Sequence, residues 1–257
     1  MLFVSCGSSK RNILNTKTSN DNTILNSTST DVTFKTSAEN FDSYLPLLKD
    51  KRVGIVTNQT GILSKEKHLV DFLIEQNINL QKIYAPEHGF RGTADAGELI
   101  VDGKDTKTNL PIISLYGNNK KPKPEQLEGI DILVFDLQDV GARFYTYISS
   151  LHYVMEACAE NNIPLLVLDR PNPNGTIIDG PILEKEHKSF VGMHEIPVLH
   201  GMTIGEYAKM INGEKWLKDS LQCNLKVAPC LNYSRDMKYS LPVKPSPNLP
   251  NDQSINL

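Results

Sequence analysis

The chain has 257 residues, of which 39% are hydrophobic and 22% are charged, and its formal net charge is −3. This composition is typical of a globular protein with room for one large domain or two small ones. The small net charge argues against nucleic-acid binding through bulk electrostatics. The sequence has no apolar run of about 18 residues, so it predicts no transmembrane helix.

The N-terminal residues resemble the end of a bacterial lipoprotein signal, because small and apolar residues precede Cys6. A lipidated Cys6 would anchor the chain to a membrane, with residues 1–6 as the remnant of the signal. More than half of residues 7–40 are Ser, Thr or Asn, and such a segment cannot bury enough apolar surface to become ordered. We therefore expect a disordered tether over 7–40 and a cell-envelope location facing the periplasm, or secretion.

Residues 41–240 alternate apolar runs with helical periods, beginning with a short helical piece at 41–48. Alternation of this kind predicts an α/β fold, a Rossmann-like parallel sheet with helices on both faces. The expected strands are 52–57, 82–85, 111–116, 131–137, 164–169 and 224–228, and the expected helices are 64–76, 124–128, 145–161, 203–213 and 214–221. Ser64 is a potential cap of the first long helix, and Thr203 with Glu206 forms a capping box. The proline-rich residues 241–257 are predicted to be a loop or linker.

Polar residues follow four of the expected strands, where an open parallel sheet binds its ligands. The candidates on these loops, together with a histidine that precedes the helix at 203, are Asn58, Glu87, His88, Arg91, Gln138, Asp139, Arg143, Tyr145, Asn172, Asn174 and His200. Several have a purely structural alternative. Asp136 can be a buried structural acid, Asn172 and Asn174 can form Asx turns, and His200 can serve the helix entry. Arg143 can pair with Asp139 or bind a carboxylate ligand.

The motifs of several protein classes are missing from the sequence. Neither GxGxxG nor GxxxxGK[ST] follows the first strand, which argues against a dinucleotide or P-loop site. No GxSxG elbow occurs, and the four cysteines have no zinc-ligand spacing. Metal binding by Glu87, His88 and Asp139 has no supporting spacing. We expect no cofactor and no metal.

Carboxylates, amides and aromatic residues on one edge suit a polyhydroxylated substrate. Glycoside hydrolysis needs a carboxylic acid that protonates the leaving oxygen, and usually a second carboxylate. Glu87 is the best candidate acid, because partial burial beside apolar residues would raise its pKa. Asp139 is the first candidate for the second carboxylate, followed by Asp136 and Asp169, and His88 completes the catalytic candidates.

Six motifs in consistent order resemble the exo-β-N-acetylmuramidase family, formerly a domain of unknown function: 86–92, 135–147, 169–175, 180–181, 200–203 and 246–250. The resemblance implies a Rossmann-like catalytic domain that releases N-acetylmuramic acid from the non-reducing ends of peptidoglycan fragments. Glu87 matches the family's proposed catalytic glutamate. The remaining candidates would line the cleft, with Arg91 or Arg143 on the lactyl carboxylate of the substrate.

The resemblance also implies that the substrate's N-acetyl group can replace a protein nucleophile. Family members continue past the Ser-Pro-Asn-Leu-Pro motif at 246–250 into a second domain, so residues 241–257 are expected to lead toward it. The predicted function is that of a bacterial cell-wall glycosidase whose partners are muramyl saccharides. The alternative is a lipid-anchored binder of such sugars without turnover.

Overall fold

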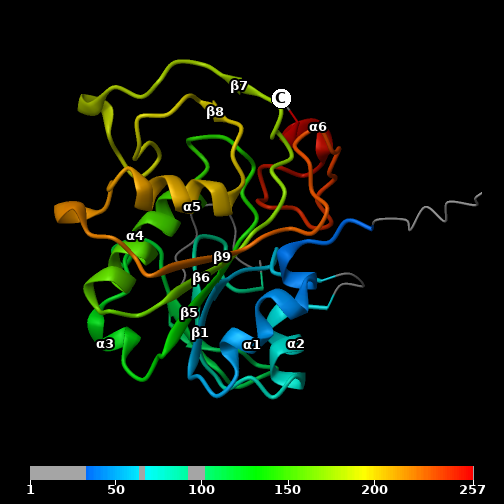
Figure 1. Cartoon of the computed structure of the whole chain (residues 1–257), viewed down its shortest axis with the longest axis vertical. Coiled ribbons are helices and arrows are strands. Elements are labelled where there is room, and N and C mark those ends of the chain that lie inside the picture. Colours follow the sequence, from blue (N-terminus) through cyan, green and yellow to red (C-terminus); the bar gives the residue numbers. More distant parts are fainter. Residues whose placement is uncertain (1–32, 64–66, 92–101, 257) are drawn as a thin grey trace, which may run out of the picture. The chain divides into compact units, whose positions relative to one another are not determined.

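The computed structural model describes residues 33–63, 67–91 and 102–256. A seven-stranded sheet lies at its centre, with strand order β3-β4-β2-β1-β5-β6-β9 (Figure 1). The strands are β1 (Val53–Thr57), β2 (Leu80–Ala85), β3 (Gly103–Lys104), β4 (Pro111–Ser114), β5 (Ile132–Asp136), β6 (Leu165–Leu168) and β9 (Leu225–Ala228). Only the edge strand β3 is antiparallel to its neighbour. The predicted parallel α/β fold is therefore confirmed.

Helices cover both faces of the sheet: α1 (Leu45–Leu48), α2 (Leu69–Glu75), α3 (Pro124–Leu127), α4 (Tyr147–Glu160) and α5 (Ile204–Gly213). Successive residues of the central strand β5 alternate between two cores. Leu133 and Phe135 pack with α3, α4 and α5, whereas Ile132 and Val134 pack with α1 and α2. Figure 1 shows these two groups of helices on opposite sides of the strands. The continuous apolar runs that predicted the strands thus reflect burial on both faces.

Two predicted helices differ from the structure by more than a few end residues. The first long helix begins at Leu69, where the His68 side chain accepts a hydrogen bond from Val70 N; Ser64 lies outside the described residues. The predicted helix at 214–221 does not form. Lys215, Asp219 and Ser220 have φ near +55°, which breaks the helix and leaves a single 3₁₀ turn at Lys218–Ser220.

The folded domain begins earlier than predicted. Ser37 and Ala38 are fully buried, and Ser37 N donates to Asp169 O at 3.2 Å. The expected tether therefore does not extend to Asn40, because a 3₁₀ turn at Ser37–Glu39 packs on the domain. The rest of the predicted tether and Cys6 lie outside the described residues.

A small second sheet pairs β7 (Ile178–Asp179) with β8 (Leu199–His200), and a last helix, α6, spans Asp252–Ile255. The predicted C-terminal loop packs on the domain through this helix. Ile255 is buried in a cluster with Val140, Ala142 and Leu199. Figure 1 shows α6 close to the end of β7. Residues 241–256 are thus part of the wall of the domain rather than a loose connection.

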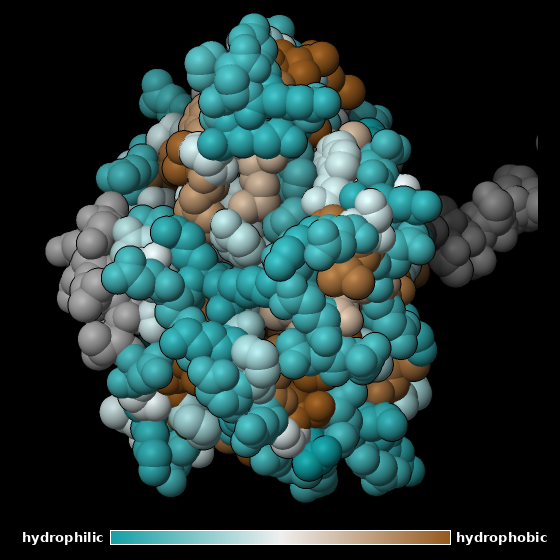
Figure 2. All heavy atoms as spheres, turned by 90° about the vertical axis from the view of Figure 1, so that its left-hand side faces the viewer, coloured by the Kyte–Doolittle hydropathy of each residue, from teal (hydrophilic) through white to brown (hydrophobic). Residues whose placement is uncertain are grey.

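Among the described residues, no helix combines the length and the apolar character that crossing a bilayer requires. Figure 2 shows one face of the molecule, on which hydrophilic side chains predominate and apolar side chains form separate patches.

Candidate functional site

The loops that follow β1, β2, β5 and β6 meet at one edge of the sheet, as predicted from the parallel order of these strands. Direct contacts join three of them. Thr60 Oγ1, after β1, accepts a hydrogen bond from the backbone N–H of Gln138, after β5, at 3.1 Å. Gln138, after β5, donates its side-chain amide to Pro171 O, after β6, at 2.7 Å. One edge thus collects most of the polar residues that the sequence singled out.

The two amides Asn58 and Gln138 are buried and bonded within the protein. Asn58 Oδ1 accepts from both the amide and the hydroxyl of Thr60, at 2.9 and 2.6 Å. Gln138 also donates to Asp139 O at 2.8 Å. The structure assigns these amides to loop support rather than to the substrate contacts that the sequence predicted, because displacing them would leave buried partners unpaired.

Asn172 and Asn174 have the same supporting role. Asn172 Oδ1 accepts from Asn174 N at 2.8 Å, which is the Asx turn considered above. Asn174 Nδ2 donates to Val140 O and to Ile255 O, so it joins the loop after β5 to α6. Both amides are 3% exposed. They fix the shape of the edge and offer little to a ligand.

Two acids considered as the second carboxylate are occupied. Asp136 forms a bidentate pair with the buried Arg170 at 2.6 and 2.9 Å. Asp169 accepts from Gly205 N and from Thr203 Oγ1, at 2.8 and 2.9 Å, at the start of α5. Burial raises the pKa of Asp169 to about 6. Both acids hold the fold together, so they are poor candidates for chemistry.

Arg91 does not extend toward a ligand. Its guanidinium forms two hydrogen bonds of 2.9 Å with Asp105 and lies 3.5 Å from Asp71. This pairing and hydrogen bonds from Thr108 lower the pKa of Asp105 to about 2. Arg91 therefore ties the loop after β2 to the segment before β4, and the predicted contact with a substrate carboxylate is not supported.

Arg143 is bonded to backbone carbonyls instead of Asp139. Its Nη1 donates to Pro181 O and Ile196 O at 2.8 and 2.6 Å, which fastens the loop after β5 to the segments around the small sheet. Asp139 Oδ2 instead accepts from Gly141 N at 2.8 Å. Gly141 has φ of +80°, and a side chain there would collide with the Asn172 amide at 2.3 Å.

Glu87 and His88 differ from the residues above because they are only partly engaged. Glu87 is half-buried and accepts one long hydrogen bond, 3.4 Å, from the hydroxyl of Tyr116. His88 is 5% exposed, and its Nδ1 has no hydrogen-bond partner among the described residues. Its backbone has φ of +72°, which is strained for a non-glycine residue. The turn thus holds an imidazole in an unfavourable conformation beside a carboxylate.

Asp139 and His200 form a second partly engaged pair. His200 Nδ1 accepts from Met202 N at 3.2 Å, so the proton of the neutral ring is on Nε2. That nitrogen faces Asp139 Oδ2 at 3.4 Å. Neither His200 Nε2 nor Asp139 Oδ1 has a hydrogen-bond partner in the part of the chain that is described, although both residues are buried. His200 therefore contributes to the helix entry through Nδ1, as considered above, whereas its Nε2 remains available to the site.

Tyr145 and Tyr147 connect these two pairs. Their rings meet edge to face, 4.8 Å apart. Burial raises the pKa of both hydroxyls, and the charges of Glu87 and Asp139 act on each in the same direction. Both carboxylates thus lie near the same two tyrosines, which stay protonated. Tyr145 also donates to Pro245 O at 2.8 Å, so it holds the C-terminal segment in place.

A hollow of about 260 Å³ opens beside Glu87. It is lined by Glu87, His88, Phe144, Tyr145, Thr146, Tyr147, Ser246, Asn248 and Leu249. Glu87 is the only carboxylate among these lining residues. The sequence missed the wall at 246–249, since a proline-rich segment without periodicity resembles a linker. It also missed Phe144, whose side chain is 59% exposed at the rim.

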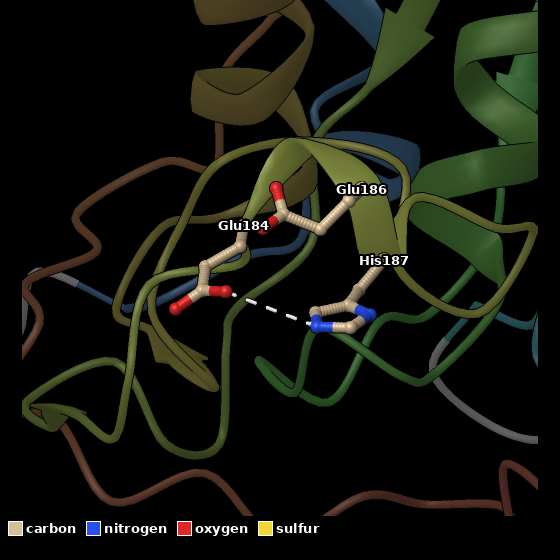
Figure 3. A group of neighbouring side chains, drawn as sticks. All are labelled: Glu184, Glu186 and His187. Atoms are coloured by element: carbon tan, nitrogen blue, oxygen red, sulfur yellow. Dashed lines mark ion pairs between the residues drawn. The ribbon is translucent and has the colours of Figure 1, made fainter.

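One group within the described ranges has the spacing of metal ligands, and it lies elsewhere. Glu184, Glu186 and His187 carry ligand atoms within 4.8 Å of one another. Figure 3 shows Glu184 and His187 facing each other, with an ion pair of 3.8 Å between them. All three side chains are exposed, and none lines the hollow at Glu87. An exposed cluster of this kind defines no site by itself.

The fold and site together define an α/β domain of the Rossmann-like class with a carboxylate-bearing hollow at the carboxyl edge of its parallel sheet. Residues 53–253 match the family model described as exo-β-N-acetylmuramidase NamZ, N-terminal. The chain belongs to this family.

Similar proteins agree with this assignment. The chain is 49% identical over 217 residues to the peptidoglycan β-N-acetylmuramidase NamZ of Bacillus subtilis, an alignment that covers 82% of this chain and 51% of the relative. Two crystal structures of DUF1343 family proteins from Bacteroides fragilis superpose with a TM-score of 0.79 each, at 48% and 41% identity. The matches cover 87% of this chain and 59% and 58% of those chains. The chain thus spans about half the length of the curated relative.

Proposed function

We propose that the chain carries the catalytic edge of a glycosidase that releases N-acetylmuramic acid from the non-reducing ends of peptidoglycan fragments. The observation that carries the proposal is the position of Glu87, the one carboxylate among the described residues that line the hollow. Membership of the NamZ N-terminal family and the similarity to the Bacillus subtilis muramidase support it.

Glu87 would act as the general acid. It protonates the glycosidic oxygen as the bond to the anomeric carbon breaks, and water finally delivers a hydroxyl group to that carbon. Tyr116 donates a hydrogen bond to Glu87 Oε1, which orients the carboxyl group and leaves Oε2 for the substrate. The rings of Phe144 and Tyr145 give the sugar an apolar wall.

The second group of the reaction is best supplied by the substrate. Asp139 is 3% exposed and does not line the hollow, although its charge acts on the same tyrosines as that of Glu87. The substrate's own N-acetyl group can attack the anomeric carbon in glycosidases that lack a protein nucleophile. Asp139 would then hold His200 and the loop at Gly141 in position.

Asp139→Asn tests this division of roles. If Asp139 only positions its neighbours, the loss of kcat stays below about 10²-fold, the lower bound for removing a general acid or base. A loss as large as that of the Glu87 variant would instead make Asp139 a direct participant.

The decisive assay compares release of chromophore from a chromogenic N-acetylmuramic acid glycoside and from the matching N-acetylglucosamine glycoside. We expect turnover of the first substrate and little of the second. The competing proposal is a protein that binds muramyl saccharides without hydrolysing them. The hollow beside Glu87 would be its binding site. Calorimetric binding of N-acetylmuramic acid without product from either glycoside would establish the binder, and neither binding nor product would reject both.

We further propose a cell-envelope location with lipid attachment at Cys6, based on the apolar residues that precede this cysteine and the Ser/Thr/Asn-rich segment after it. Mass spectrometry of membrane fractions tests it, because a Cys6→Ser variant would lose the acyl mass and move to the soluble fraction. An unmodified Cys6 in membrane-free protein would contradict the proposal.

A further inference from the structure

A second hollow, of about 250 Å³, lies between α4, the segment at 188–195 and the turn after α5. Its lining residues are His152, Lys188, Met193, His194, Glu195 and Trp216. None of them belongs to the hollow at Glu87. Trp216 is the only tryptophan of the chain. It is partly exposed, so its indole presents apolar surface to the hollow.

The indole is held in a fixed orientation. Trp216 stacks on the imidazole of His194, with ring centroids 4.5 Å apart and planes inclined by 18°. His194 is 4% exposed and is itself bonded on both nitrogens, to Tyr207 Oη and to His152 Nδ1, each at 2.9 Å. The aromatic surface is therefore rigid before any ligand arrives, which reduces the entropy lost on binding.

A directional chain of hydrogen bonds sets this orientation. Glu156 is bonded to Lys121 at 2.7 Å and lies 3.5 Å from His152 Nε2, so the proton of His152 is on that nitrogen. His152 Nδ1 then accepts from His194 Nε2, and His194 Nδ1 accepts from the hydroxyl of Tyr207. Burial lowers the pKa of His194 to about 3, so both stacked rings carry no charge near neutral pH.

The rim of the hollow offers both a donor and an acceptor. Lys188 and Glu195 are exposed and lie 3.2 Å apart. A free anion such as phosphate would meet the Glu195 carboxylate beside the Lys188 ammonium. A sugar hydroxyl both donates and accepts, so it can bond to either group.

We propose that this hollow binds one pyranose ring of a saccharide, with the ring's C–H face on Trp216 and Met193 and its hydroxyls on Lys188 and Glu195. A rigid aromatic wall with a few polar groups at the edge has the general character of a small-molecule site. The site would hold a saccharide chain at a second point, apart from the hollow that holds the reacting bond. The saccharide class rests on the proposed function, whereas the hollow itself does not.

Fluorescence of the single tryptophan reports on this site directly. We would titrate the whole chain with N-acetylglucosamine and N-acetylmuramic acid, monosaccharides that the proposed reaction leaves intact. The expected result is a saturable change in emission with a dissociation constant of about 1 mM, as suits a ligand with few contacts. Glutamate and inorganic phosphate serve as probes for a carboxylate or phosphate site.

Rim variants identify where the sugar sits. Lys188→Ala and Glu195→Gln should each weaken binding about two- to fivefold, the effect of one exposed polar contact. Lys185→Ala is the matched control, because Lys185 is also exposed and lies 3.9 Å from Glu195 but does not line the hollow. Glu87→Gln should leave the emission change intact, and this separates the proposal from the fate of the proposed activity.

Each other result rejects the proposal. An emission that stays constant to about tenfold above the expected dissociation constant shows that no sugar binds beside Trp216. An equal response to glutamate or phosphate shows an anion site. A response that disappears in Glu87→Gln shows that the sugar occupies the first hollow only. The NMR signal of the one indole N–H, followed in the same titrations, repeats the measurement without relying on emission intensity.

Discussion

Two parts of the same sheet edge differ in whether their buried charged groups are paired. Around Arg170, every acid is paired, since Asp136 binds the guanidinium and Asp169 binds the start of α5. Around Glu87, three buried atoms have no hydrogen-bond partner among the described residues: Asp139 Oδ1, His200 Nε2 and His88 Nδ1. Paired groups stabilise a fold, whereas buried unpaired ones reduce its stability and are retained where chemistry needs them.

The largest effect is expected from Glu87→Gln. The variant keeps the size of the side chain and removes the proton donor, so kcat on a muramic acid glycoside should fall by about 10²- to 10⁴-fold. The melting temperature should barely change, because Glu87 makes one long hydrogen bond. The exposed Glu125 supplies the control variant Glu125→Gln, and equal activity of the wild type and Glu87→Gln would end the assignment.

Arg170→Ala tests the paired side of the comparison. Removing the guanidinium leaves the Asp136 carboxylate buried and unpaired, which should lower the free energy of unfolding by about 3–5 kcal/mol. Arg52→Ala removes a similar pair with Asp131 at the surface, where 52% of the Arg52 side chain is exposed, and should change the free energy of unfolding far less than Arg170→Ala does. Chemical denaturation measures both, and comparable losses would show that burial of the pair has no special role.

The raised pKa of Asp169 predicts a pH-dependent difference between wild type and Asp169→Asn. The folded state binds a proton up to about pH 6 and the unfolded state only up to about pH 3.8. The contribution of Asp169 to stability is therefore fully present below pH 3.8 and is lost as the pH rises through 6. The free energy of unfolding of wild type, relative to Asp169→Asn, should fall by roughly 2–3 kcal/mol between pH 4 and pH 7.

His194 contributes in the opposite direction over the same range, since its pKa is lowered to about 3 and acid therefore destabilises the folded state. His194 is present in both wild type and Asp169→Asn, so its effect cancels when their free energies of unfolding are subtracted. If the difference in free energy of unfolding between wild type and Asp169→Asn does not vary with pH, the pKa of Asp169 is not raised in the folded state.

The smallest effect is expected from Tyr145→Phe. The variant loses the hydrogen bond to Pro245 O and should lose about 1 kcal/mol of stability. KM should rise more than kcat falls, because residues 246–249 form one wall of the hollow. Tyr153→Phe, whose ring stacks on Phe190, is the control. Faster hydrogen exchange confined to the C-terminal segment would locate the effect, and unchanged exchange there would contradict it.

The six predicted strands correspond to β1, β2, β4, β5, β6 and β9, whereas the two-residue strands β3, β7 and β8 were not predicted. β1 and β5 are buried at every position, so their sequences are continuous apolar runs. The helix expected at 214–221 does not form because Lys215 and Asp219 have positive φ, which periodicity does not reveal.

The sequence placed the candidate residues on one edge of the sheet, whereas it did not reveal which contacts each of them makes. Asp136, Asp139 and Asp169 all lie at or just after the end of a strand and look equivalent in the chain. Asp136 differs because it binds Arg170, which is 34 residues away and reaches it only in the folded protein. Asp169 differs because it accepts hydrogen bonds from Thr203 and Gly205. In the same way, the sequence does not reveal that Arg91 binds Asp105, which is 14 residues away in the chain.

The left-handed backbone of His88 has a consequence for how this domain can evolve. A non-glycine residue in that conformation costs about 1 kcal/mol, and its buried Nδ1 adds to the cost. Glycine at this position would relieve both, so random mutation and selection for thermal stability alone should enrich it. Replacement of His88 by glycine in this chain is therefore expected to raise its thermal stability, and its effect on the proposed activity tests whether the imidazole is needed there.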